Sequence, residues 1–177
     1  QLGLQGGARL DGDDAVAVAF VKSDARCAVP TADGEINAPP LSRWYAHDVR
    51  HDTTTSVVVT FAQPEAGAWR FTHGQFLTVQ ATIGGQAVRR CYSLCSTAPN
   101  GPLTVGIRQI PSGLFSTWAN HVLAPGDVVE ALRPSGDFTH GLEPDHSREY
   151  LLVAGGSGIT PLVAIASTIL HHEPEST

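Results

Sequence analysis

FLTVQATIGGQAVRRCYSLCS, residues 76–96, is the stretch of this sequence that says most about the fold. Its first part, Phe76–Ile83, is a candidate β-strand. Gly84 and Gly85 then give a hairpin signal, because two glycines can form the tight turn that joins antiparallel strands. Residues 86–96 return as the next strand. The stretch therefore predicts two neighbouring antiparallel strands.

Further candidate strands lie on both sides of this hairpin. Residues 56–61 are β-branched and apolar, and residues 103–110 follow a strong turn signal at 99–102. Residues 127–132 follow another turn, at 124–126. Strands at this spacing predict a closed antiparallel barrel or a sandwich.

One short helix is expected between these strands. Ser112 could cap its start, and Leu114, Trp118 and His121 or Val122 share a face at helical spacing. The start of such a helix can bind an anion, because its first N–H groups are unpaired and its dipole favours negative charge. An ordinary capped surface helix is the alternative.

The pattern changes towards the end of the sequence. Glu149–Ala154 is a short apolar strand without alternation, as in a parallel sheet that is buried on both faces. A glycine loop follows at 155–158, and then a helix over about residues 160–171, with Thr160 as N-cap and Pro161 at the first helical position. This strand–loop–helix is typical of the opening of a nucleotide-binding α/β domain, which we expect to be incomplete. A tight turn that needs glycine for its geometry alone is the alternative.

The first 40 residues give weaker signals. Residues 15–21 could be a strand, residues 26–30 its hairpin partner, and residues 37–40 a linker stiffened by prolines. The sequence has three cysteines, whose spacing fits neither a disulfide framework nor an iron–sulfur site. We therefore expect buried thiols at Cys91 and Cys95.

Composition and charge exclude several classes of protein. The formal net charge is -6, the pI is about 5.7, and no basic stripe is present, so we expect no nucleic-acid partner. No apolar run approaches the roughly 20 residues that span a bilayer. The N-terminus lacks the pattern of a signal peptide, so we expect a cytoplasmic protein without a membrane segment. The eight histidines show no ligand spacing, so no metal site is expected.

Arg90 and Tyr92 lie two residues apart on a predicted strand, so both side chains point to one face. An arginine can hold a phosphate through two hydrogen bonds, and a tyrosine ring beside it can stack on a flat heterocycle. The alternative is a surface arginine next to a core tyrosine, and the spacing by itself favours this alternative.

Three motifs in one order resemble those of the ferredoxin–NADP reductase superfamily. They are Arg90-Cys91-Tyr92-Ser93-Leu94, Gly113-Leu114-Phe115-Ser116-Thr117 and Gly155-Gly156-Ser157-Gly158-Ile159-Thr160-Pro161. The branch that the sequence resembles is that of the multicomponent oxygenase and phenylacetyl-CoA oxygenase reductases, over about residues 43–172. The resemblance implies a mainly β fold: a six-stranded antiparallel Greek-key barrel that binds FAD, followed by an α/β nicotinamide domain. We expect the N-terminal extension at 1–40, the barrel at 41–145 and the start of the second domain at 146–177.

The resemblance also implies a role for each motif. Arg90 would contact the flavin diphosphate, Tyr92 would stack on the isoalloxazine ring, and Ser93 would hydrogen-bond near the flavin N5, where hydride arrives. Tyr92 and Ser93 are thus the residues expected to act at the reacting ring. Strict alternation puts Ser93 on the opposite face from Tyr92, so its role requires a twist or a bulge. The other expected flavin contacts are Cys91, Ile107, Arg108, Gly113, Leu114, Phe115, Ser116, Thr117 and Thr160, and the expected NAD(P) contacts are Gly155, Gly156, Gly158, Thr160 and Pro161.

The function that this resemblance implies is electron transfer. An FAD-dependent reductase would pass electrons from NAD(P)H to an iron–sulfur protein or an oxygenase component. The alternative is a flavin-binding module without NAD(P)H turnover, since the nicotinamide domain looks barely begun. A third possibility, an iron-chelate reductase of the related siderophore-interacting group, would favour a more basic surface.

Overall fold

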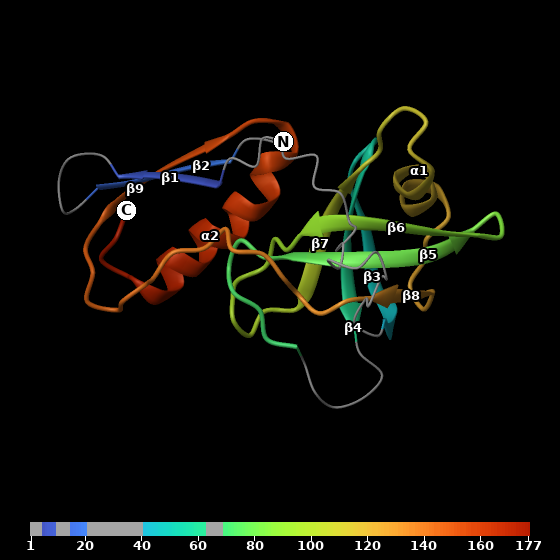
Figure 1. Cartoon of the computed structure of the whole chain (residues 1–177), viewed down its shortest axis with the longest axis horizontal. Helices are drawn as coiled ribbons and strands as arrows, with labels where there is room; N and C mark the ends of the chain where they lie inside the picture. Colours follow the sequence, from blue (N-terminus) through green and yellow to red (C-terminus); the bar gives the residue numbers. More distant parts are fainter. Residues whose placement is uncertain (1–4, 10–14, 21–40, 63–68) are drawn as a thin grey trace, which may run out of the picture.

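Two bodies lie side by side in the computed structural model, which describes residues 5–9, 15–20, 41–62 and 69–177 (Figure 1). One is a barrel of six strands, and the other is a three-stranded sheet with one long helix, α2 (Ile159–His172). Helix α2 lies between that sheet and the barrel, and the backbone N–H of Ala98 in the barrel donates to Oγ1 of Thr168 in α2 at 3.0 Å.

The barrel confirms the mainly β, six-stranded antiparallel fold. Its strands lie in the order β6-β5-β8-β3-β4-β7, and every neighbouring pair is antiparallel. A bridge between Leu94 and Val105 joins the ends of β6 and β7, and so closes the sheet on itself. The strands are β3 (Ser42–Thr53), β4 (Ser56–Ala62), β5 (Phe76–Ile83), β6 (Gln86–Ser93), β7 (Leu103–Arg108) and β8 (Val128–Ala131).

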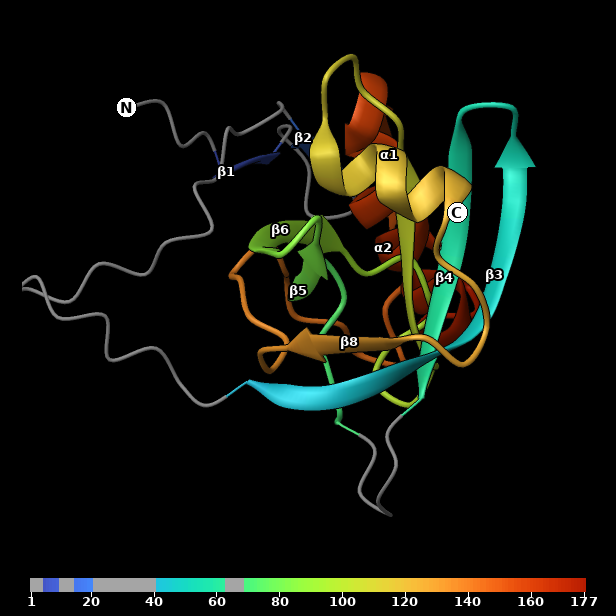
Figure 2. The same ribbon diagram turned by 90° about the vertical axis from the view of Figure 1, so that its right-hand side faces the viewer.

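The core of the barrel follows from alternation along its strands. In β4, Val57, Val59 and Phe61 are buried and the residues between them are partly exposed. This is the pattern of a strand with one face towards a core. The register of β3 against β4 shifts between Ala46 and Asp48, and such a bulge lets a sheet bend into a barrel. Figure 2 shows β3 and β4 as a long curved hairpin at one side of the barrel.

The strands predicted within the described residues are present, with some of their ends shifted. The sequence did not reveal β3, because most of its residues are polar and exposed. Residues 1–4, 10–14, 21–40 and 63–68 lie outside the described residues, and with them the predicted hairpin arm at 26–30 and the linker at 37–40.

Helix α1 (Leu114–His121) begins one residue later than expected and buries a different face. Its N-cap is Gly113, without a side-chain cap, so the prediction of Ser112 as the cap is wrong. Leu114 is 45% and Val122 63% exposed, whereas the buried residues are Phe115, Ser116, Ala119 and Asn120. Asn120 explains the difference, because its Nδ2 donates to the Ile107 carbonyl in β7 at 3.2 Å and turns a polar face inward.

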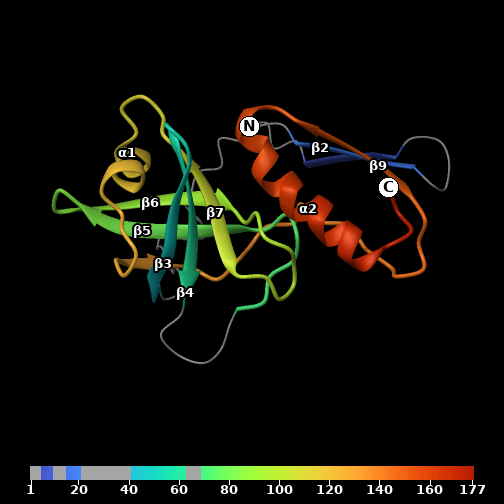
Figure 3. The ribbon, with the colours of Figure 1, turned by 180° about the vertical axis from the view of Figure 1, so that it is seen from behind.

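The second body combines both ends of the described chain. Strand β2 (Ala15–Phe20) pairs antiparallel with β1 (Gln5–Arg9) and parallel with β9 (Glu149–Ala154), as Figure 3 shows from behind. The predicted strand at 15–21 is therefore confirmed, but its hairpin partner is β1.

Burial on both faces was wrongly predicted for β9. Leu151 is 57% and Val153 54% exposed, whereas Tyr150 and Leu152 pack on the α2 cluster of Leu162, Ile165 and Ile169. The reason is that α2 covers one face of β9, towards which only alternate side chains point.

Helix α2, unlike α1, begins one residue earlier than expected. A 3-10 turn at Gly156–Gly158 runs directly into it, and Gly158 is its N-cap. Thr160 and Pro161 are therefore the second and third helical residues, so their predicted positions are wrong. A proline is still tolerated there, because the first N–H groups of a helix have no partner within the helix.

Candidate functional site

Arg90 and Tyr92 share one face of β6, as predicted. Tyr92 lies opposite Leu77 and Arg90 opposite Val79, whose buried side chains mark this as the inward face of the sheet. The Tyr92 ring packs against Phe115 of α1, with 5.7 Å between ring centroids. The Arg90 guanidinium is exposed and donates to the Arg89 carbonyl at 2.7 Å. The pair thus forms a half-buried ring next to an accessible positive charge.

Tyr92 remains neutral over the whole physiological range. Burial raises the pKa of its hydroxyl to about 12, against a smaller opposite effect of the Arg90 charge. A neutral ring suits stacking on a flat heterocycle, since it adds no negative charge to the site.

Cys91 and Ser93 lie on the opposite face of β6. The pairing of β5 with β6 is regular up to the pair of Phe76 with Ser93, so the strand contains no bulge that turns Ser93. Ser93 is the last residue of β6, and its proposed contact with the flavin depends on the twist at this strand end. Cys91 is within 3.3 Å of the Thr78 hydroxyl and takes part in a disulfide, so the expected free thiol is wrong at this position. Cysteine spacing does not show which sulfur atoms meet in space.

Cys95 is a partly buried free thiol, as expected. Its Sγ lies 3.4 Å from the Thr104 carbonyl. Burial raises the pKa of this thiol, so it is protonated near neutral pH and unreactive.

The start of α1 is a preformed loop. The buried Ser116 hydroxyl donates to the Gly113 carbonyl at 3.1 Å and accepts from the Ile110 N–H at 3.2 Å. A Cβ at Gly113 would collide with Ile110 and with this hydroxyl, so the loop requires glycine. Backbone N–H groups in the first turn of a helix have no intrahelical partner, and here they could hold a phosphate.

The remaining predicted flavin contacts differ in access. Leu114, Arg108 and Thr117 are exposed. The Thr117 hydroxyl accepts from the Gln109 side-chain amide at 3.5 Å. Phe115 and Ile107 are buried in the barrel core. These two residues can therefore offer a ligand their backbone only.

The glycine loop at 155–158 is open on its outer side. Gly156 has a φ of 58°, a conformation that favours glycine. Gly155 has ordinary extended backbone, and a Cβ placed on it would meet nothing within 4 Å. The fold therefore does not require glycine at 155, whereas the close approach of a ligand would.

At least one residue of each of the three motifs lies at or next to the seam where β6 meets β7. Helix α1 contacts both strands and, through Phe115, Tyr92. On the other side, Thr160 approaches β7, where a Cβ on Gly106 would lie 3.7 Å from its Cγ2. Segments far apart in the sequence thus pack against the same two strands, Phe115 of α1 on Tyr92 and Thr160 next to Gly106.

Two residues of this arrangement were missed by sequence reasoning. Gly106 leaves the space next to Thr160, and Asn120 holds α1 on β7. A glycine within an apolar strand signals close approach of another segment, and this could have identified Gly106. No sequence signal distinguishes Asn120 from a surface asparagine.

A family model described as the oxidoreductase FAD-binding domain matches residues 45–140. This match covers the barrel, α1 and the motif on β6. The chain belongs to the oxidoreductase FAD-binding domain family. The residues present fit the cofactor: an exposed guanidinium, a neutral half-buried ring and a helix start line the same seam.

Among curated relatives of this FAD-binding chain is a component of the 1,2-phenylacetyl-CoA epoxidase of Escherichia coli (strain K12), 40% identical over 130 residues. These residues cover 72% of the chain and 36% of the relative. The aromatic O-demethylase reductase subunit of Amycolatopsis sp. is 34% identical over 161 residues, which cover 82% of the chain and 46% of that subunit. The chain therefore spans less than half the length of these relatives.

Solved structures of the FAD-binding family agree with the fold. An Amycolatopsis cytochrome P450 reductase superposes with a TM-score of 0.61 at 35% identity, over 81% of this chain and 44% of that one. A phthalate dioxygenase reductase superposes with a TM-score of 0.62 at 24% identity, over 74% of this chain and 40% of that one. At that identity the likeness shows the fold alone.

Proposed function

We propose that this chain is the FAD-binding part of a reductase that takes electrons from NAD(P)H and passes them to an iron–sulfur protein or an oxygenase component. The observation that carries the proposal is that Tyr92, α1 and Thr160, one part of each motif, lie at or next to the β6–β7 seam in a chain of the FAD-binding family. The likeness to an epoxidase component and to an O-demethylase reductase subunit supports this kind of acceptor.

Each motif has a proposed task at the seam. When bound, FAD supplies the redox chemistry, since it accepts two electrons together and releases them singly. Arg90 neutralises the diphosphate together with the first N–H groups of α1, and Tyr92 supports the ring. Ser93 offers a hydroxyl at the strand end. Thr160 and the glycine loop receive the nicotinamide dinucleotide.

The proposed division of the chain follows the two bodies. Residues 41–145 form the FAD-binding barrel, and residues 146–177 form the beginning of the NAD(P)-binding unit. No function is proposed for residues 1–40, of which β1 and β2 extend the sheet of the second unit. Within the described parts of the chain, none of the helices has the length and apolar character needed to cross a membrane. The cytoplasmic location stays a prediction.

Absorbance of the purified chain tests the central claim. We expect a yellow protein with a flavin band at about 450 nm, before or after addition of FAD. A chain that stays colourless and takes up no FAD contradicts the proposal.

NAD(P)H turnover separates the proposal from its alternative, a flavin-binding module without turnover of its own. The measurement is steady-state oxidation of NAD(P)H with an artificial electron acceptor. Turnover supports the reductase, and bound flavin without turnover supports the module.

Replacement of Arg90 tests the diphosphate contact. Arg90→Ala should weaken FAD binding about tenfold or more and FMN binding less, because only FAD carries a diphosphate. Titration of the apoprotein with both flavins measures this. Arg89→Ala is the matched control, since the Arg89 guanidinium is held by Gln80 at 2.8 Å on the other face of the strand. Equal losses for FAD and FMN would argue against the role of Arg90.

A further inference from the structure

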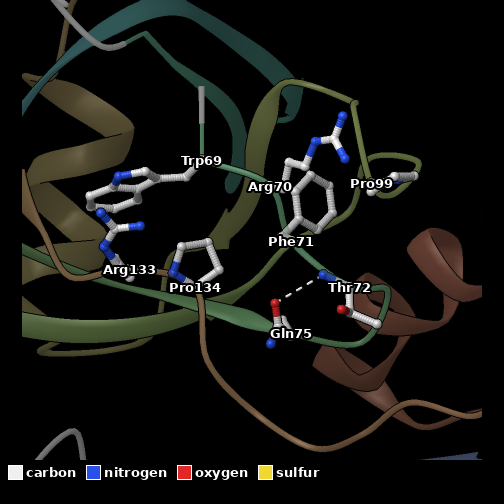
Figure 4. Close-up of a pocket in the computed structure, with 8 residues that line it drawn as sticks. All are labelled: Trp69, Arg70, Phe71, Thr72, Gln75, Pro99, Arg133 and Pro134. Atoms are coloured by element: carbon white, nitrogen blue, oxygen red, sulfur yellow. Dashed lines mark hydrogen bonds between the residues drawn. The ribbon is translucent and has the colours of Figure 1, made fainter. Parts of the chain in front are cut away.

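A hollow of about 400 Å³ opens at the end of the barrel where β5 begins and β8 has ended. None of the residues assigned to the flavin or the dinucleotide lines it. Its walls come from the segment before β5, from the loop after β6 and from the segment after β8 (Figure 4). The lining residues are Trp69, Arg70, Phe71, Thr72, Gln75, Pro99, Arg133 and Pro134.

Two guanidinium groups flank this hollow, which we call the Trp69 pocket. The Arg133 guanidinium lies over the Trp69 ring at 5.4 Å from its centroid, and the Arg70 side chain extends on the far side of Phe71 (Figure 4). Both arginines are exposed, and neither forms an ion pair with a carboxylate of the described residues. None of the eight lining residues is acidic. The pocket is therefore a local positive site on a chain whose net charge is -6.

The Trp69 ring, which forms the aromatic wall of the pocket, is held in place by the barrel core. Trp69 packs edge-on against the buried Trp44, with 4.5 Å between ring centroids. The Trp69 ring thus lies between a core residue and the Arg133 guanidinium. Tryptophan and arginine are both enriched among the residues that contribute most to binding at protein interfaces, and a ring that is already fixed loses little side-chain entropy on binding.

The floor of the pocket is connected to the proposed flavin site. Gln75 accepts the backbone N–H of Thr72 at 2.9 Å through Oε1 and donates to the Gly136 carbonyl at 3.4 Å. Its own carbonyl accepts the N–H of Leu94, the residue after Ser93, at 2.9 Å. A protein bound at the pocket would therefore lie close to the end of β6, and rates of electron transfer fall steeply with distance.

From these observations, and resting on the proposed function, we infer that the Trp69 pocket is the docking point for an acidic segment of the electron-accepting protein. The two guanidinium groups lie at different sides of the pocket, so they fit two carboxylates of one segment better than a single small anion. A long polyanion is disfavoured by the net negative charge of the rest of the chain. The local charge steers an acidic partner to this end of the barrel.

Electron exchange with an acidic plant-type [2Fe–2S] ferredoxin tests the inference. The FAD-loaded chain is mixed at low salt with the reduced ferredoxin, whose cluster loses one electron while the flavin gains one. Flavin reduction is followed at about 450 nm. Arg70→Glu and Arg133→Glu should each slow the bimolecular rate about tenfold, and the difference should shrink at high salt.

Arg50→Glu is the charge-matched control. Arg50 is exposed on β3, opposite Val58, and takes no part in the pocket. Its variant should keep a rate near that of the unmodified chain. Dithionite, a small reductant that needs no docking surface, should reduce the flavin equally in all variants.

The possible failures are distinguishable. Equal ferredoxin rates for the pocket variants and Arg50→Glu, with normal reduction by dithionite, overturn the docking site alone. A chain that takes up no FAD overturns the proposed function and the docking site together.

Discussion

The barrel and the β9–α2 unit bury their side chains in different proportions. Among residues 41–62 and 69–177, whose burial the structure describes, 20 buried apolar residues form the barrel cluster, and Leu162, Ile165 and Ile169 of α2 form the cluster of the second unit. The second unit instead depends on polar contacts around Glu173, which is 0% exposed. The comparison indicates that the barrel can be stable by itself, whereas the second unit is sensitive to single polar groups.

The polar contacts of Glu173 join the end of α2 to the segment before β9. Its Oε1 accepts from the Glu143 N–H and lies 3.1 Å from His146 Nδ1, and its Oε2 accepts from the hydroxyls of Tyr150 at 2.7 Å and Ser176 at 2.9 Å. Burial alone would raise the pKa of this carboxyl, but these hydrogen bonds outweigh burial and lower the pKa. The carboxylate is therefore the form that holds the unit together.

The largest effect is expected from the barrel core. Leu77→Ala should lower the free energy of unfolding by about 2–5 kcal/mol, because Leu77 is 0% exposed and its removal leaves a cavity. Chemical denaturation monitored by tryptophan fluorescence measures this. Leu151→Ala is the matched control, since Leu151 is 57% exposed, and it should cost about 0.5 kcal/mol or less. Similar losses for both variants would mean that the two units do not differ as described.

A smaller and local effect is expected at Glu173. Glu173→Gln should cost about 1–3 kcal/mol, because an amide nitrogen would face two of the donors that the carboxylate now satisfies. Hydrogen exchange should become faster in α2 and stay unchanged in β4 and β7. Glu175→Gln, at an exposed position, is the control. Equal exchange in both variants would show that the second unit does not depend on the Glu173 carboxylate.

A pH dependence of stability is expected where the two bodies meet. Burial, together with the nearby His140 and His172, lowers the pKa of His73 from 6.5 to about 4. The His73 Nε2 lies 3.0 Å from the Thr139 hydroxyl and accepts the His140 N–H, so its neutral form fits the fold. Between pH 6.5 and 4 the unfolded chain binds a proton that the folded chain does not bind. The contribution of neutral His73 to stability is therefore full above pH 6.5 and is lost as the pH drops towards 4.

Thermal unfolding across this pH range measures the effect. His73→Gln keeps an acceptor but cannot be protonated, so its unfolding temperature should fall less between pH 6.5 and 4. The exposed His47 supplies the control variant, His47→Gln. If the unfolding temperature of His73→Gln falls with pH as steeply as that of the unmodified chain, His73 does not cause the pH dependence.

Much of the fold could be predicted because its signals are local. The hairpin at 76–96, the alternation of β4 and the strand–loop–helix at 149–172 depend on neighbouring residues and on turn chemistry. The errors came from longer-range contacts. Leu114 and Trp118 were expected to share the face that defines α1, but Leu114 is exposed and Asn120 contacts β7 instead, and β9 was expected to be covered on both sides.

The sequence alone identifies the motifs that resemble a flavin site and a dinucleotide loop, and the order in which they occur. Tertiary packing then brings parts of these motifs to neighbouring strands, because Phe115 of α1 packs on Tyr92 and Thr160 lies next to Gly106 of β7. The Trp69 pocket and the burial of Glu173 have the same origin. Each depends on segments that are distant in sequence, and no local pattern of hydrophobicity records which distant segments pack together.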